Sequence, residues 1–167
     1  MKITVWRIVR EKYLDKALTG EGAKLWGGRW NPVGQPAVYC AGHLSLGILE
    51  MIVHLDEYID IHRFVAVPVS FNEKSVWTLS SDQLPGGWNE LPIGPASIAF
   101  GEKWLNEKNH MVLSVPSIIV PLEHNYIIDP LHIDFTSIES GTPRKIRLDP
   151  RLYNLIAGKK PEQSLSH

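Results

Sequence analysis

Short apolar runs separated by glycine and proline constrain this chain more than any other feature. Five of them are rich in β-branched and aromatic residues, as strands are, and they cover residues 3–10, 37–41, 62–71, 111–121 and 125–129. Two longer runs, residues 44–58 and 95–109, have the length and apolar content of helices. Many short strands with two or three helices predict a compact α+β domain rather than an alternating βαβ sheet.

The remaining segments are expected to be connections. Residues 11–36 are glycine-rich and predicted to be mostly loop, residues 72–94 hold turn signals, and residues 144–156 complete the fold. Proline has no N–H to donate to a ladder, so Pro68 predicts that its strand lies at a sheet edge or carries a bulge.

Length and charge exclude several classes of protein. The 167 residues fit one domain, predicted over residues 1–157, with a polar tail at 158–167. Lys and Arg number 17 against 18 Asp and Glu, so no basic excess indicates a duplex-binding surface. The chain opens without the apolar core of a signal peptide, and no run approaches the roughly 20 apolar residues that cross a bilayer. We expect a soluble cytoplasmic protein with no membrane or direct nucleic-acid partner.

The run GGRWN, residues 27–31, places a fixed charge on very flexible backbone. The guanidinium of Arg29 is a rigid fork of donors that suits a phosphate or carboxylate. Gly27 and Gly28 allow positive φ and a close approach of the backbone to a ligand. Trp30 offers a flat apolar face, and Asn31 offers a donor and an acceptor. The alternative is an ordinary turn in which Arg29 pairs with a surface acid.

Three more residues attract attention for their surroundings. Glu50 stands among apolar neighbours in the predicted helix, where it either turns to water beside His54 or has a specific role. Gly47, one turn earlier, would leave space beside the carboxylate. Tyr39 is either a core tyrosine or a stacking surface for an aromatic ring. Ser117 follows a proline with no GxSxG elbow around it, so it is not predicted to be a hydrolase nucleophile.

Metal and phosphate-loop chemistry receive no support from the motifs. The seven histidines are scattered, and none lies in HExxH or in a Cys/His array. No Walker A or GxGxxG motif is present. The single cysteine, Cys40, lies in an apolar run and is predicted to be a buried hydrophobe rather than a nucleophile. We expect no metal.

Taken in order, the segments WRIV, GEGAKLWGGRWNPVGQPAVYCAGHLSLGILE, VPSIIVP and RLDPRL closely resemble the RES domain family. The resemblance runs from about residue 5 to about residue 152, nearly the whole chain. It implies a fold similar to that of ADP-ribosyltransferase toxins, with short strands in a split or bent sheet flanked by helices. One departure is Gly47, where alanine is more usual.

The resemblance also implies a function. RES proteins are toxins of bacterial type II toxin–antitoxin pairs that deplete cellular NAD, and their partners are Xre-type helix-turn-helix antitoxins. The family's arginine, glutamate and serine match Arg29, Glu50 and Ser117, and its active-site tyrosine matches Tyr39. Arg7 matches a further arginine common in the opening strand. A cognate antitoxin is expected to shield the site, and a dimer within that complex is compatible with this reading.

These residues suit the chemistry of NAD as a substrate, with no separate cofactor. Nicotinamide leaves as a neutral molecule, so the barrier is positive charge at the ribose anomeric carbon, which Glu50 would stabilise. Water or inorganic phosphate would accept the ADP-ribosyl group. The alternatives are a protein ADP-ribosyltransferase and a non-catalytic nucleotide- or partner-binding module. The catalytic residues are predicted to be Arg29, Tyr39, Glu50 and Ser117. The residues predicted to contact NAD are Arg7, Gly27, Gly28, Arg29, Trp30, Asn31, Tyr39 and Ser117.

Overall fold

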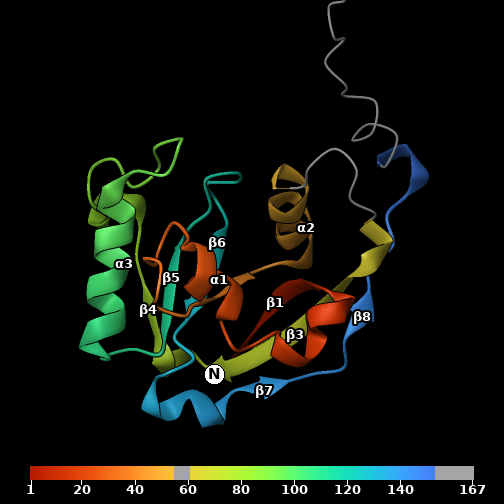
Figure 1. The fold of residues 1–167 in the computed structure, drawn as a ribbon, viewed down its shortest axis with the longest axis horizontal. Helices are drawn as coiled ribbons and strands as arrows, with labels where there is room; N and C mark the ends of the chain where they lie inside the picture. The colour runs from red at the N-terminus through yellow and green to blue at the C-terminus, as the bar shows by residue number, and fades with distance from the viewer. Residues whose placement is uncertain (55–60, 153–167) are drawn as a thin grey trace, which may run out of the picture.

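The computed structural model describes residues 1–54 and 61–152 as a bent sheet with helices packed along it (Figure 1). The predictions for residues 55–58 and 153–157 and for the tail at 158–167 lie outside the described residues. The strands are β1 (Lys2–Arg10), β2 (Val38–Ala41), β3 (Phe64–Asn72), β4 (Val76–Thr78), β5 (Val112–Pro116), β6 (His124–Ile128), β7 (Glu139–Ser140) and β8 (Arg144–Lys145). The α-helices are α1 (Glu21–Trp26), α2 (Leu44–Val53) and α3 (Pro95–Glu107). The predicted α+β class is confirmed.

The strands pair in the order β4-β5-β6-β2-β1-β3-β7, and β8 also pairs with β3. β4 and β5 are parallel, whereas the other neighbouring pairs are antiparallel. β1 and β3 match residue for residue along their full length, but β1 meets β2 at a single pair, Trp6 with Ala41. The sheet therefore bends between β1 and β2, which leaves β2 and β6 at its centre.

Pro68 shows how β3 tolerates a proline beside two neighbours. The carbonyl oxygen of Pro68 accepts a hydrogen bond from the Gly141 amide, on the side of β3 away from β1. Because N–H and C=O of one strand residue point to the same side, the missing N–H also faces that side. There, β8 pairs with Val65 and Ala66, and β7 pairs with Val69 and Ser70. The proline thus lies in the gap between β7 and β8, and the prediction of an edge strand was wrong, because β3 pairs with β1 on one side and with β7 and β8 on the other.

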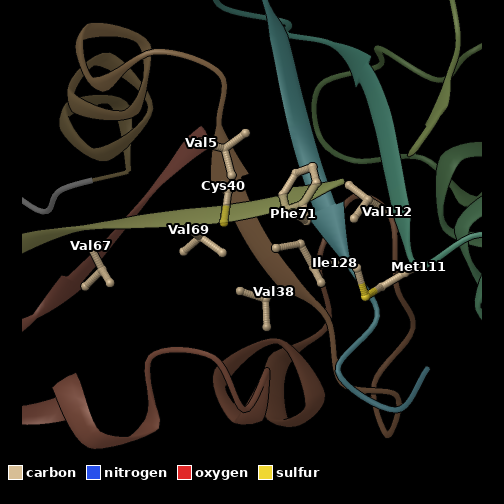
Figure 2. Close-up of a cluster of buried hydrophobic side chains, with 9 residues drawn as sticks. All are labelled: Val5, Val38, Cys40, Val67, Val69, Phe71, Met111, Val112 and Ile128. Carbon is tan, nitrogen blue, oxygen red and sulfur yellow. The ribbon is translucent and has the colours of Figure 1, made fainter. Parts of the chain in front are cut away.

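One face of the sheet carries a core built from several strands, shown in Figure 2. Strand alternation sends Val5, Val38, Cys40, Val112 and Ile128 to this face. The rest of the buried cluster comprises Val67, Val69, Phe71 and Met111. Partly buried residues from the 3-10 helices η1 (Glu11–Lys16) and η5 (Ile133–Ser137) and from their flanks pack against it.

The other face is covered by α2 at one end and by α3 at the other, as Figure 1 shows. Met51 of α2 packs in a cluster with Phe64 and Ala66 of β3. Trp104 and Leu105 of α3 pack in a separate cluster with residues of β5 and β6. The two helices leave between them the part of this face formed by β2 and β6. This is where the polar side chains described below gather.

The loop prediction for residues 11–36 was wrong in part, since η1 and α1 lie there. Neither element contains a buried residue, so neither has the apolar periodicity that marks a helix in a sequence. The three residues of β4 and the two of β7 were missed for a related reason. Strands this short are held by pairing with distant segments, and their own sequence carries little signal.

No helix among residues 1–54 and 61–152 has both the length and the apolar character needed to traverse a membrane.

Candidate active site

Glu50 is the centre of a buried hydrogen-bond network. It lies on α2, is half-buried, and its Oε1 accepts two hydrogen bonds. Ser117 donates from Oγ at 2.9 Å, and Asn125 donates from Nδ2 at 2.6 Å. Within the described part of the chain, Oε2 accepts no hydrogen bond. The carboxylate is therefore held through one oxygen by two protein side chains, so it is not simply a solvated helix edge, and its role in catalysis stays a prediction.

Ser117 is completely buried in the turn that follows β5. Its Oγ accepts hydrogen bonds from the amides of Ile119 at 3.0 Å and Val120 at 3.1 Å. A hydroxyl has one proton and two lone pairs, so these amides leave the proton for Glu50. Ser117 has no donor left for a ribose or phosphate, and its contact with ligand stays a prediction that this geometry does not favour.

Gly47 brings α2 close to the sheet. A Cβ at Gly47 would lie 3.1 Å from Ile8 Cδ1 and 3.4 Å from Ala41 Cβ. The expected space beside the carboxylate is thus occupied by β1 and β2, and that expectation was wrong. The close packing instead places Glu50, one turn later, within reach of β6.

Tyr39 closes the turn that carries Arg29. Its hydroxyl donates to Asn31 Oδ1 at 2.7 Å and accepts from the Trp30 amide at 2.9 Å. Burial raises the pKa of Tyr39 well above its ordinary value, so the hydroxyl stays neutral. A Cβ at Gly28 would lie 2.6 Å from this hydroxyl. Gly28 therefore makes room for Tyr39, a use of the glycine that the sequence did not reveal.

Asn31 is fully buried and its amide is engaged by the surrounding backbone. Its Nδ2 donates to the carbonyl oxygens of Ala23 at 2.9 Å, Gln35 at 2.9 Å and Pro32 at 3.1 Å. The side chain thus holds the end of α1 against the following loop. Its predicted contact with NAD is not supported by this position, because no donor is left over.

Trp30 lies in the core rather than on a ligand-facing surface. Its side chain is 3% exposed, and its ring stacks on Trp88 and meets Phe100 edge-on, both at 6.1 Å between ring centroids. α3 crosses directly over its backbone, since a Cβ at Gly101 would lie 2.0 Å from the Trp30 carbonyl oxygen. The predicted stacking of a ligand ring on Trp30 is therefore not supported by its position.

Arg29 projects from this turn and is oriented by a distant loop. Its Nη1 donates to the carbonyl oxygens of Trp88 at 2.7 Å and Glu90 at 3.1 Å. Partial burial lowers the pKa of Arg29, although the nearby charge of Glu50 opposes this shift. The guanidinium is thus close enough to Glu50 for the two charges to interact. Within the described residues, Nη2 and Nε of Arg29 donate no hydrogen bond, so they are available to a ligand. The GGRWN run forms a tight turn, in which Arg29 pairs with backbone carbonyl oxygens and not with a surface acid, and its contact with an anionic ligand stays a prediction.

Arg7 belongs to the opposite face of β1. Successive side chains of a strand point to opposite faces. Trp6 and Ile8 pack on the face that α2 covers, so Arg7 points to the other face, together with Val5. Its Nε donates to the Ala17 carbonyl oxygen at 3.2 Å, and its Nη1 to that of Tyr39 at 3.1 Å. The structure brings Arg29, Tyr39, Glu50 and Ser117 together, and it connects Arg7 to them through the backbone of Tyr39.

Asn125 is the site residue that sequence reasoning missed. It lies on β6, opposite Ala41 of β2 and Val115 of β5, so its backbone is fixed on both sides. The available signal was an asparagine within the run NYIID, at the edge of a predicted strand. Nothing in the sequence pairs it with Glu50, because the contact spans 75 residues. Among the described residues, no group of three or more potential metal ligands is found.

The comparisons with known proteins agree with this architecture. The family model described as RES domain matches residues 4–149, and the chain belongs to the RES domain family. "Toxin Res" of Photorhabdus laumondii is 37% identical over 131 residues, covering 78% of this chain and 84% of that protein.

Two further similarities concern a relative found by sequence and a solved structure with a similar fold. "Prs ADP-ribosylating toxin" of Sphingobium sp. strain YBL2 is 37% identical over 158 residues, covering 91% of this chain and 98% of that protein. The crystal structure of the M. tuberculosis MbcT–MbcA toxin–antitoxin complex contains a chain with a TM-score of 0.69 and 17% identity, covering 95% of this chain and 91% of that one. At that identity the similarity concerns the fold alone.

Proposed function

We propose that this protein is the toxin of a toxin–antitoxin pair and that it cleaves the bond between nicotinamide and ribose in NAD. The toxin role is supported by similar proteins that are themselves named as toxins. The observation that carries the chemistry is the oriented carboxylate of Glu50, with Oε1 held by two donors and Oε2 available, near the cation of Arg29. This arrangement suits a substrate that has both an anionic pyrophosphate and a developing cation.

The reaction needs no general acid. The C–N bond breaks with its electron pair leaving on nicotinamide, which becomes neutral, and positive charge spreads over the anomeric carbon and ring oxygen. Glu50 Oε2 stabilises that charge, and Arg29 binds the pyrophosphate through Nη2 and Nε. The acceptor oxygen then bonds to the anomeric carbon and releases its proton. Water gives ADP-ribose, and inorganic phosphate gives its 1″-phosphate.

The test mixes purified protein with NAD, with and without inorganic phosphate, and follows products by mass spectrometry. Glu50→Gln keeps the size of the side chain and removes the charge, so we expect turnover to fall by about 10²–10³-fold or more. Glu102→Gln makes the same change at an exposed position on α3 and serves as the matched control. Persistence of NAD in every tube, or equal rates for both variants, would contradict the proposal.

A protein ADP-ribosyltransferase is the second candidate, because one relative is named an ADP-ribosylating toxin. It uses the same residues and differs in the acceptor. Label transferred from NAD to a protein band in host extract, with no free ADP-ribose produced in its absence, would favour it. A non-catalytic binding module would bind NAD and release no nicotinamide.

An antitoxin is the expected partner, and the complex named for MbcT and MbcA supports a partner of that kind. We propose that it covers the surface near Arg29. Co-expression with the cognate antitoxin should yield a complex whose NAD turnover is suppressed. Turnover equal to that of the free protein would argue against shielding.

A further inference from the structure

Asn125 reaches Glu50 by a hydrogen bond whose direction is fixed by chemistry. An ionised carboxylate only accepts, so the amide nitrogen of Asn125 must face Oε1 across 2.6 Å. The opposite amide orientation would put two acceptors in contact. A donor to a charged acceptor forms one of the stronger classes of hydrogen bond, and this one lies on a central strand.

The two donors act on the same oxygen from different segments. Ser117 comes from the turn after β5, and Asn125 comes from β6, the next strand of the sheet. The Ile119 and Val120 amides fill the two lone pairs of the Ser117 oxygen, which leaves its proton to donate to Glu50. Ser117 and Asn125 together select one orientation of the Glu50 carboxylate about its Cγ–Cδ bond, with Oε1 toward the sheet.

We propose that Asn125 is a positioning residue that, together with Ser117, fixes Glu50 so that Oε2 alone faces the reacting carbon. This inference rests on the proposed function and names a residue outside the Arg29–Tyr39–Glu50–Ser117 set. Asn125 acts through Glu50 and does not itself contact substrate. A carboxylate preoriented in this way needs no reorganisation when positive charge develops.

The diagnostic variant is Asn125→Asp, which keeps the shape of the side chain and replaces the donor by a second carboxyl group. Above neutral pH two carboxylates would face each other at 2.6 Å, and we expect kcat to fall by about 10²-fold, with KM for NAD changing less than about threefold. As pH falls, the pair takes up a proton, and the introduced carboxyl can donate to Glu50 as the amide did. Activity of the variant, relative to the wild type at the same pH, should therefore recover toward acid.

Two controls separate positioning from a general structural role. Asn72→Asp makes the same change where the side chain only accepts, from the Lys74 amide, so its pH profile should match the wild type. Asn125→Leu removes the donor without adding an acid, so activity should be lost without recovery at low pH. An Asn125→Asp protein with wild-type kcat and pH profile would overturn the proposal.

A second readout does not depend on turnover, so failure of the proposed function is distinguishable. The melting temperature of Asn125→Asp, relative to wild type, should decline between about pH 5 and pH 8, because both carboxyls ionise in contact. Adding Glu50→Gln should abolish that decline. Wild-type protein that leaves NAD intact would refute the function only, whereas a pH-independent difference in melting temperature would refute the positioning.

Discussion

Replacing Tyr39 by phenylalanine tests whether its hydroxyl is structural or chemical. The change deletes one oxygen that bonds the fully buried Asn31 and the Trp30 amide. Each buried group left without a partner costs about 1–3 kcal/mol, so Tyr39→Phe should lose about 3 kcal/mol of unfolding free energy. In a domain of 167 residues this corresponds to a melting temperature lower by about 6–12 °C.

Turnover should respond differently. Because burial raises the pKa of Tyr39 and both partners are internal, the hydroxyl is not expected to exchange protons with substrate. At 20 °C, where the variant is folded, kcat should fall less than about tenfold, whereas loss of a general acid or base costs about 10²–10⁴-fold.

Calorimetry and NAD turnover on the same sample give both numbers. Tyr126→Phe is the matched control, since the Tyr126 hydroxyl makes no hydrogen bond within residues 1–54 and 61–152, and its melting temperature should change by less than about 2 °C. An unchanged melting temperature for Tyr39→Phe, combined with a hundredfold loss of kcat, would refute the structural reading.

Three further changes have definite expected outcomes. Burial raises the pKa of the Cys40 thiol to about 12, so Cys40 should resist a thiol reagent at pH 8 in native protein. The same thiol should react at once in denaturant. Fast labelling of the native protein would contradict this prediction. Burial lowers the pKa of His124, so the unfolded chain binds its proton more readily and stability should decline as pH falls below about 6.5. A His124→Gln variant should show a shallower decline in urea titrations. Gly101→Ala would place a methyl on the Trp30 carbonyl and should prevent soluble expression, whereas Gly22→Ala, with open space around it, should melt at or slightly above the wild-type temperature.

Much of the fold was predictable where local pattern and final structure agree. The β-branched run at residues 3–10 became β1, and the helix expected from residue 44 begins there. α3 begins at Pro95, as a proline in the first turn predicts. The elements that escaped prediction, such as α1 and β4, bury little of their own surface or take their shape from a partner strand.

The site was predictable in its charged residues and not in its supports. Glu50 stands out in the sequence because a charge is costly among apolar neighbours, and Arg29 stands out because it follows two glycines. The roles of Gly28 and Asn31 depend on where the Tyr39 hydroxyl lies, and that position is set by tertiary packing. A single sequence therefore indicated the charged residues of the candidate site, while the hydrogen bonds that orient them required coordinates.

The span of the Glu50 network has a consequence for the synthesis of this protein. The glutamate leaves the ribosome before its two donors, which follow 67 and 75 residues later. Until β6 has been translated and has joined β2 and β5, the Glu50 carboxylate lacks its hydrogen bond from Asn125. Fragments that end before Asn125 therefore contain Arg29, Tyr39 and Glu50 without an assembled site. If the proposed function holds, the chemistry can begin only after Asn125 has been synthesised and has paired with Glu50.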